Sequence, residues 1–183
     1  MTGTLRGKLL LAGPILKDPN FDRTVVLITE HSDEGAMGLV LNRPSDAAVI
    51  DAVPDLSWAA DPGETVYVGG PVAPNGVIVL AEWEDPSQAI LLVDDDLGFV
   101  PGDAEDTDAL ASAVRRARVY AGHAGWGPGQ LEAELEEEAW IVEPPLRDEL
   151  FSDDPDGLWS AILRRMGREF ALLSTMPPDP SLN

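Results

Sequence analysis

Residues 24–44 read TVVLITEHSDEGAMGLVLNRP, and this stretch contains the strongest strand pattern in the chain. Its first part, TVVLITEH, is rich in β-branched residues, which favour strands. LVLNRP is a second apolar run, and it ends at Pro44, which cannot donate to a sheet. The polar segment SDEGAMG between the two runs is typical of a turn. The stretch therefore predicts an antiparallel hairpin over residues 24–42, closed by a loop longer than a two-residue turn.

Short apolar runs separated by turn signals continue through the rest of the chain. They predict strands in KLLLAGPIL (8–16), AILLV (89–93) and AWIVEPP (139–145), and a strand that starts in RVYAGHAGWG (118–127). A second hairpin is predicted in residues 61–83, where two valine-rich runs flank a turn of Gly, Pro and Asn. The strands come in hairpins and not in βαβ repeats, which favours an α+β fold.

Three segments have the spacing of helices: residues 106–117, 129–139 and 156–167. The first, DTDALASAVRRA, has Asp106 to cap its start and Arg115 and Arg116 to suit its C-terminal dipole. We see no internal repeat and no Gly/Ser linker. We therefore expect one domain over residues 1–183, with a mobile tail at residues 175–183.

The charge balance is strongly acidic, with 33 Asp and Glu against 12 Lys and Arg and a net charge of −21. No Lys or Arg occurs between Arg43 and Arg115, a stretch that contains fifteen Asp and Glu. Binding to nucleic acid relies on cations that neutralise phosphates, so direct binding to nucleic acid is disfavoured. Two short arginine clusters, RRAR (115–118) and RRMGR (164–168), are interpreted as solvated helix faces.

Several classes of chemistry are missing from the sequence. The chain has no cysteine, which removes disulfides, thiolate catalysis and cysteine-bound zinc. It has no GxSxG elbow, and its Ser and His residues show no triad order. No apolar run reaches the roughly 18 residues that a membrane helix needs. No export signal is present, so we expect a cytoplasmic protein without membrane contact.

The glycine-rich segment AGHAGWGPGQLEAEL, residues 121–135, is the clearest candidate for a phosphate-binding loop. It lacks the Lys and hydroxyl residues of a P-loop and the third glycine of a dinucleotide fingerprint. Glutamates already occupy the start of the helix that follows. We interpret the segment as a structural corner, with Trp126 packed over it. A ligand-binding loop that includes Trp126 and Gln130 is the alternative.

No pattern of metal ligands is convincing. His31 has acidic neighbours, but adjacent strand residues point to opposite faces, so a polar strand end is the favoured interpretation. DPNFD resembles the start of an EF-hand loop, but Arg23 replaces the required glycine. Residues 94–96, DDD, are interpreted as a solvated strand exit. The sequence therefore predicts neither a metal nor a cofactor.

Four polar residues near the first hairpin form the strongest candidate site. Arg23 begins one predicted strand, Asn42 and Arg43 end the next, and Asn20 lies in the preceding loop. If the hairpin forms, these side chains lie at one edge. An arginine pair is a natural receptor for carboxylate or phosphate. The alternative, which is the favoured interpretation, is that the two arginines pair internally with Asp18, Asp22 or Glu30.

Three motifs, in order along the chain, resemble the bacterial YqgE/AlgH family: the segment over residues 7–44, VYVGGPV (66–72) and AGWGPGQLEAELEEEAW (124–140). The resemblance implies an α+β fold with an antiparallel-rich, bifurcated sheet that forms a pseudo-barrel flanked by helices. It also implies a bacterial cytoplasmic protein. His123 departs from the family pattern, in which an aromatic Tyr is expected. Members are often labelled as candidate transcriptional regulators, but no catalytic residues are established. The matching residues are therefore only candidates for ligand binding: Asn20, Arg23, Asn42, Arg43, Trp126 and Gln130, with Asp18 and Glu30 beside them.

Three functions compete at this point. The favoured one is a non-catalytic module that binds a small ligand or a protein partner, with a regulatory role exerted indirectly. The second is a hydrolase or nucleotide-processing enzyme that uses the edge formed by Asn20, Arg23 and Arg43. The third, a direct transcriptional regulator, is disfavoured by the net charge of −21. The sequence predicts no particular oligomeric state.

Overall fold

The computed structural model describes residues 3–176. Most of the predicted tail, residues 177–183, lies outside this range. The predicted hairpin is present as β2 (Val25–Ser32) and β3 (Gly35–Val40), which pair antiparallel. Its loop is only two residues long, so the prediction of a longer loop is wrong. The first half of β3, which the sequence predicts as part of the turn, forms a strand and also pairs with β9 (Val114–Trp126), on the side away from β2.

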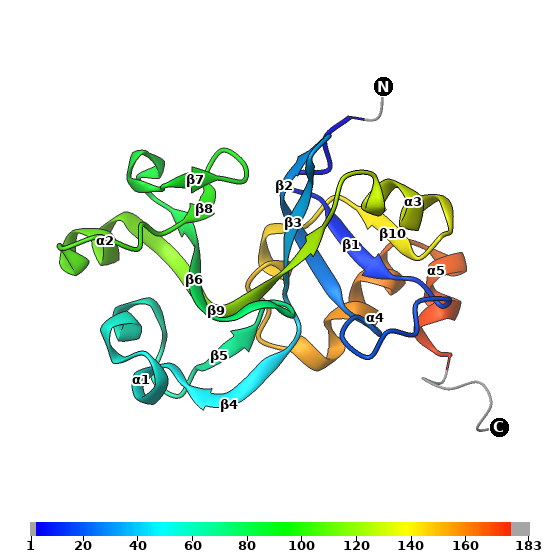
Figure 1. Cartoon of the computed structure of the whole chain (residues 1–183). Helices are drawn as coiled ribbons and strands as arrows, with labels where there is room; N and C mark the ends of the chain where they lie inside the picture. Colours follow the sequence, from blue (N-terminus) through cyan, green and yellow to red (C-terminus); the bar gives the residue numbers. More distant parts are fainter. Residues whose placement is uncertain (1–2, 177–183) are drawn as a thin grey trace.

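The strands of the described region form a ten-stranded sheet in the order β10-β1-β2-β3-β9-β6-β8-β7, with β4 and β5 off this path. The fold is α+β, as predicted, and the sheet is not closed. Figure 1 shows β9 crossing from one half of the molecule to the other. The remaining strands are β1 (Leu9–Ala12), β4 (Pro44–Ala48), β5 (Thr65–Val68), β6 (Val72–Trp83), β7 (Leu91–Leu92), β8 (Leu97–Phe99) and β10 (Trp140–Glu143).

The bifurcation of the sheet lies at β9. Over residues 114–123 this strand pairs antiparallel with β6, and over residues 124–126 it pairs with β3. It also pairs in parallel with β5, where Tyr67 lies opposite Tyr120. The predicted hairpin over residues 61–83 is wrong, because β5 and β6 pair with β9 and not with each other.

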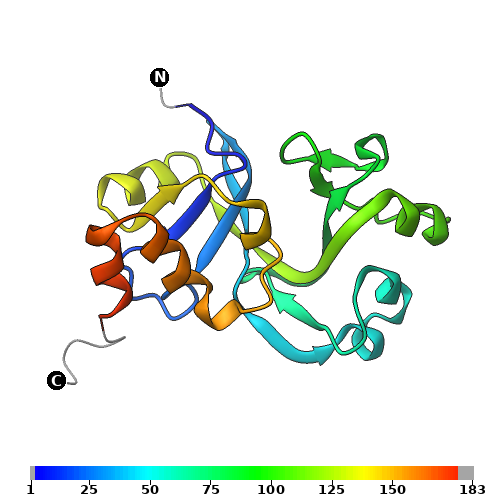
Figure 2. The same ribbon diagram turned by 180° about the vertical axis from the view of Figure 1, so that it is seen from behind.

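Two sets of helices flank the two halves of the sheet (Figures 1 and 2). One half carries α3 (Gln130–Glu136), α4 (Pro155–Arg165), α5 (Arg168–Ser174) and the short 3-10 helix η3 (Arg147–Glu149). The other carries α1 (Val49–Ala52), α2 (Thr107–Ala113) and the 3-10 helices η1 (Pro54–Ala59) and η2 (Pro86–Gln88). Among these helices, none is long and apolar enough to cross a bilayer.

The central strands are buried on both faces, which explains why their sequences are continuously apolar. Leu9 and Leu11 of β1 belong to a core cluster that includes Ile162 of α4. Leu10, between them, belongs to a second cluster on the opposite face, with Leu131 of α3. Side chains alternate across a strand, so one short apolar run supplies both clusters.

The helix predicted over residues 106–117 is shorter than expected. Asp106 caps it as predicted, by accepting a hydrogen bond from the Ala109 N–H at 3.0 Å. The helix ends at Ala113, however, and the RRAR segment continues as strand β9. Pairing with β6 overrides the helical propensity, since Arg116 lies opposite Glu82 and Arg118 opposite Leu80. The interpretation of RRAR as a helix face is therefore wrong.

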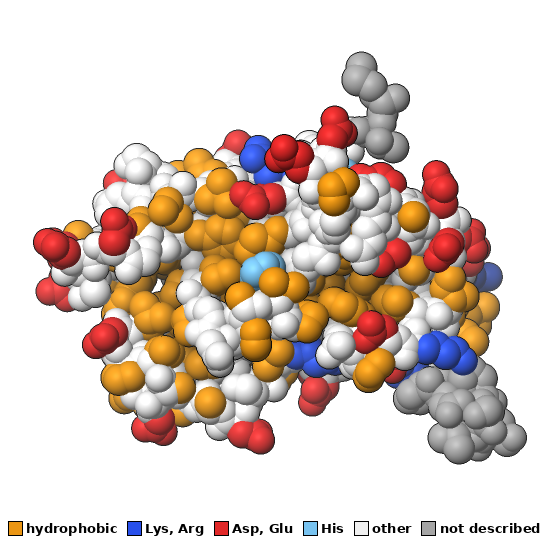
Figure 3. All heavy atoms as spheres, in the orientation of Figure 1, with side chains coloured by type: hydrophobic (Ala, Val, Ile, Leu, Met, Phe, Trp, Pro, Cys, Tyr) orange, Lys and Arg blue, Asp and Glu red, His pale blue; other side chains and the backbone are white. Residues whose placement is uncertain are grey.

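Charge and apolar surface are unevenly distributed over the molecule. Figure 3 shows hydrophobic side chains gathered over the middle of one face and acidic side chains around its margin. The RRMGR segment does lie on helices, as predicted, at the end of α4 and the start of α5. There Arg165 forms ion pairs with Glu143 and Glu149, both at 2.7 Å.

Close backbone contact between β9 and the segment that joins β5 to β6 leads to a first prediction. Gly70 has a φ of 150°, and a Cβ atom there would lie 2.2 Å from the carbonyl carbon of His123. We expect Gly70→Ala to lower the free energy of unfolding by about 3 kcal/mol, through both strain and overlap. Gly63→Ala is the control, because its φ is 88° but its Cβ would meet open space; it should cost about 1 kcal/mol. Urea denaturation measures both, and equal losses would contradict the role of the contact.

Candidate ligand-binding site

The structure brings Arg23, Asn42 and Arg43 together, as the sequence predicted, but it uses them to hold the backbone. Asn42 is buried; its side chain accepts a hydrogen bond from the Val25 N–H at 3.0 Å and donates one to the Arg23 carbonyl at 2.9 Å. Arg43 donates to the backbone carbonyl of Asp22. Internal pairing was the stated alternative, yet the partners are backbone carbonyls and not carboxylates.

Arg23 and Asn20 occupy the loop that leads into β2. Arg23 has a left-handed backbone with φ of 54°. Its guanidinium lies 4.9 Å from the centre of the Trp159 ring and donates to the carbonyl of Met176. The side chain of Asn20 is exposed and makes no hydrogen bond with the described residues. A cavity of only about 50 Å³ adjoins Arg23, which leaves little room for a ligand.

The glycine corner is closed by its own hydrogen bonds. Gly129 has a φ of 75° and directly precedes α3. Gln130 accepts a hydrogen bond from the Gly127 N–H at 3.0 Å and donates one to Glu134 at 3.1 Å. Trp126 and Trp140 each donate an indole N–H to Glu134 at 2.8 Å. Glu134 therefore anchors the corner, a role that the glutamate run in the sequence did not reveal.

His31 links β2 to α3. Its Nδ1 accepts a hydrogen bond from the Leu5 N–H at 3.0 Å, so the ring proton is on Nε2, which donates to Glu132 at 2.7 Å. This hydrogen bond lowers the pKa of Glu132 below its ordinary value of 4.5. Within residues 3–176, no group of three or more His, Asp or Glu residues is arranged to hold a metal ion.

A different residue, Arg118 of β9, is a buried cation. It is only 6% exposed. Its Nη1 donates to the Ser152 carbonyl at 3.0 Å, and its guanidinium lies 4.5 Å from the centre of the Tyr67 ring. No carboxylate oxygen of the described residues lies within 4.0 Å of it. Buried charges are usually paired, so this one is an exception.

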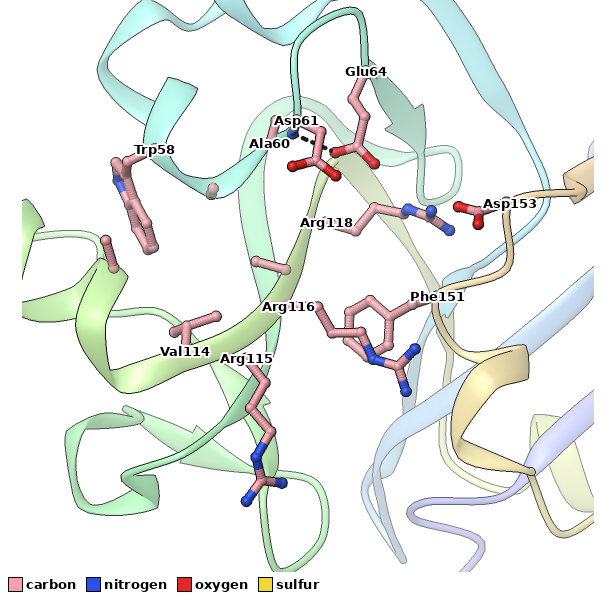
Figure 4. Close-up of a pocket in the computed structure, with 13 residues that line it drawn as sticks. Trp58, Ala60, Asp61, Glu64, Val114, Arg115, Arg116, Arg118, Phe151 and Asp153 are labelled. Carbon is pink, nitrogen blue, oxygen red and sulfur yellow. Dashed lines mark hydrogen bonds between the residues drawn. The ribbon is translucent and has the colours of Figure 1, made fainter.

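Arg118 borders a cavity of about 330 Å³, which we call the Arg118 pocket. Figure 4 shows its position between the sheet, η1 and the segment before α4. The neighbouring arginines are already paired. Arg115 binds Glu84 at 2.6 Å, and Arg116 binds Asp148 at 3.0 Å. Of the three, Arg118 alone has no carboxylate partner, and its one hydrogen bond leaves further guanidinium N–H groups available to a ligand.

Two tyrosines lie beside Arg118. The Tyr67 and Tyr120 rings meet edge to face at 5.9 Å. The Tyr120 hydroxyl is buried and makes no hydrogen bond with the described residues. Burial raises the pKa of both Tyr67 and Tyr120, while the positive charge of Arg118 partly opposes the rise. Both phenols are therefore neutral at physiological pH and cannot neutralise Arg118.

Carboxylates lie around the pocket at a greater distance. Three carboxylates line the pocket, and Figure 4 shows them around the end of the Arg118 side chain: Asp61, Glu64 and Asp153. Glu64 accepts a hydrogen bond from the Asp61 N–H at 3.0 Å. Apolar surface comes from Trp58 of η1 and from Phe151. The pocket thus combines one unpaired cation, several carboxylates and two aromatic rings.

Comparison with known proteins places the chain in a family. The sequence profile of a family described as AlgH-like matches residues 9–171. The chain belongs to the AlgH-like family. AlgH-like relatives include a Thermobifida fusca protein, 39% identical, and a Streptomyces avermitilis protein, 44% identical; each match covers 98% of this chain and 96% of the relative. Both are named "UPF0301 protein", which states no activity.

Solved structures agree with the AlgH-like fold. A crystal structure of a Corynebacterium diphtheriae protein, 29% identical, superposes with a TM-score of 0.85 and covers 96% of this chain and 94% of its own. The solution structure of the AlgH protein from Pseudomonas aeruginosa, 33% identical, gives a TM-score of 0.72 over 97% of this chain and 98% of its own.

The buried amide of Asn42 gives a second prediction for this AlgH-like chain. Asn42→Ala should lower the free energy of unfolding by about 2 kcal/mol, because it leaves the buried Val25 N–H without a partner. Asn20→Ala removes the same group at an exposed position and should change the free energy of unfolding by less than about 0.5 kcal/mol. Urea denaturation of the two variants decides the matter. Similar values for both would show that the Asn42 amide is not a structural link.

The contact between His31 and Glu132 gives a third prediction. The pKa of Glu132 is lower in the folded state than its ordinary value of 4.5. The stability that its carboxylate contributes is therefore fully present above pH 4.5 and is lost as pH falls through the folded pKa. The difference in unfolding free energy between wild type and Glu132→Gln should therefore shrink as pH falls below 4.5. Glu136→Gln, on the exposed face of the same helix, is the control. A difference that stays constant from about pH 6 to about pH 3 would contradict this linkage.

Proposed function

We propose that this chain is a non-catalytic module that binds a small ligand carrying both an anionic group and a cationic amine. The Arg118 pocket is its site. The observation that supports the proposal most directly is the buried, unpaired guanidinium of Arg118. An uncompensated buried charge is expensive, and a ligand carboxylate or phosphate would compensate it. The planar arginine fork suits such groups because it can donate two parallel hydrogen bonds to them.

The surrounding carboxylates define the rest of the ligand. Asp61, Glu64 and Asp153 would repel a simple anion from the pocket. An amine on the same molecule would face these carboxylates while the anionic group faces Arg118. A zwitterion therefore fits the charge pattern better than a simple acid. The volume of about 330 Å³ suits a small metabolite, and Trp58 and Phe151 supply the apolar contact.

The competing functions receive less support. In the edge formed by Asn20, Arg23 and Arg43, both arginines already donate to backbone carbonyls. Direct DNA binding would need cations on the surface, but the RRAR arginines are either paired with carboxylates or buried. A regulatory role would be indirect, through a change that ligand binding makes in contacts with another protein.

A thermal-shift experiment tests the proposal. The probes are the standard amino acids and small aminophosphonic acids, each compared with the matching acid that lacks the amine. We expect at least one zwitterion to raise the Tm, by about 5–10 °C at about 100 times its Kd. Its deaminated counterpart should raise the Tm much less, because the carboxylates of the pocket repel it.

Two variants and a control connect the shift to the pocket. Arg118→Gln should abolish the ligand-induced rise, measured against the Tm of the ligand-free variant. Arg118→Lys keeps the charge but loses the fork, so it should reduce the rise. Arg168→Gln removes an exposed arginine of α5 and should leave the ligand-induced rise in Tm unchanged. If the same ligand stabilises Arg118→Gln as strongly as wild type, or if no zwitterion shifts the wild type, the proposed function is wrong.

A further inference from the structure

A second concave region, separate from Arg118, lies over the half of the molecule that contains β6 and β8. It is a broad groove of about 1210 Å³. Its lining comes from β6, from the 3-10 helix η1, from α2 and from the segments on either side of β7 and β8. Figure 3 shows hydrophobic side chains gathered over this region. We call it the β6 groove.

The β6 groove exposes large apolar side chains. Val77 of β6 is 41% exposed and Ile90, just before β7, is 66% exposed, and both line the groove. Leu91 and Phe99 also line the groove, and Phe99, at 7% exposed, forms part of its floor. Isolated exposed apolar residues are ordinary, but a contiguous apolar surface in a concave region marks a place where another molecule binds.

The two charged residues that line the groove, Glu30 and Asp55, are both acidic. Apart from Glu30 and Met37, every lining residue belongs to residues 44–114, the segment that lacks Lys and Arg but contains fifteen Asp and Glu. No Lys or Arg is found among the described residues that line the groove. The complementary surface is therefore apolar in the middle and basic at its margin.

This charge pattern separates the candidate occupants. A second copy of the chain would place carboxylates of one base-free segment opposite carboxylates of the other. Nucleic acid and anionic lipid surfaces carry the same sign of charge as the groove margin, so they are repelled. A basic protein segment is attracted.

The backbone around the groove favours a helix over an added strand. β6 is paired with β9 on one side, and from Leu80 onward it is paired with β8 on the other. Only a short edge before Leu80 is open to a new strand. An amphipathic helix satisfies its own backbone hydrogen bonds, so it can lie in the groove with only its apolar face buried.

We propose that the β6 groove docks a basic amphipathic helix of a partner protein. Leucine-like side chains of the helix would contact Val77, Ile90 and Phe99. Lys or Arg side chains on its flanks would face the carboxylates at the margin, among them Asp55 and Glu30. Trp58 lines both hollows, but the helix contacts named here are not those assigned to the ligand of the Arg118 pocket, so either proposal can fail without the other.

The experiment uses a synthetic amphipathic helix of about 18 leucine and lysine residues as the probe. Its binding to the full chain is followed by fluorescence anisotropy at physiological ionic strength. Two further peptides serve as controls: one has the same composition in a scrambled order, and one has glutamate in place of lysine. We expect the helical leucine–lysine peptide to bind at least about tenfold more tightly than either control.

Paired variants locate the site. Val77→Lys with Ile90→Lys should weaken binding by about tenfold or more, because the new charges repel the peptide and remove apolar contact. Ile15→Lys with Leu172→Lys adds the same charge at two exposed apolar positions in the other half, 57% and 71% exposed, and should change binding by less than about threefold. All four positions are exposed, so the Tm of each double variant should stay near that of wild type.

Three results would overturn the proposal. The first is equal weakening by both pairs of substitutions, which would indicate attraction by net charge alone. The second is equal binding of the scrambled peptide. The third comes from sedimentation: a wild-type dimer that Val77→Lys with Ile90→Lys converts to monomer would show that a second copy of the chain covers the groove.

Discussion

The backbone pairing of β9 is the constraint on which the rest of the structure depends. This one strand pairs with β3, with β6 and in parallel with β5, so it joins the two halves of the sheet. Side chains alternate along it, which places Arg116, Arg118 and Tyr120 on one face. The segment around Phe151 covers that face, while η1 packs with Ala117 and Val119 on the opposite face, and the Arg118 pocket lies where residues of both segments meet β9.

Local patterns predicted much of the fold but not the pairing of distant strands. The β2–β3 hairpin and the Asp106 cap follow from residues close in sequence, and both are present. The parallel pairing of β5 with β9 could not be predicted, because it places Tyr67 opposite Tyr120, more than fifty residues away along the chain. Pairing with β6, another distant segment, makes a strand of residues 114–117, which local propensity assigned to a helix.

The candidate site was predictable only in part. Sequence reasoning found Arg23, Asn42 and Arg43 and brought them to one edge, but it could not tell a ligand from a backbone carbonyl as their partner. It passed over Arg118, because RRAR was interpreted as a solvated helix face. The alternation of polar and apolar residues in RARVYAG, residues 116–122, was the available signal for a strand with one half-buried polar face.

The indole of Trp58 belongs to the lining of both the Arg118 pocket and the β6 groove. It lies on η1, a six-residue 3-10 helix held between the two hollows. A molecule in either hollow that displaces this ring alters the shape of the other. If binding in one hollow changes the affinity of the other through Trp58, the second ligand changes the affinity of the first by the same factor, because linkage between two binding equilibria is reciprocal.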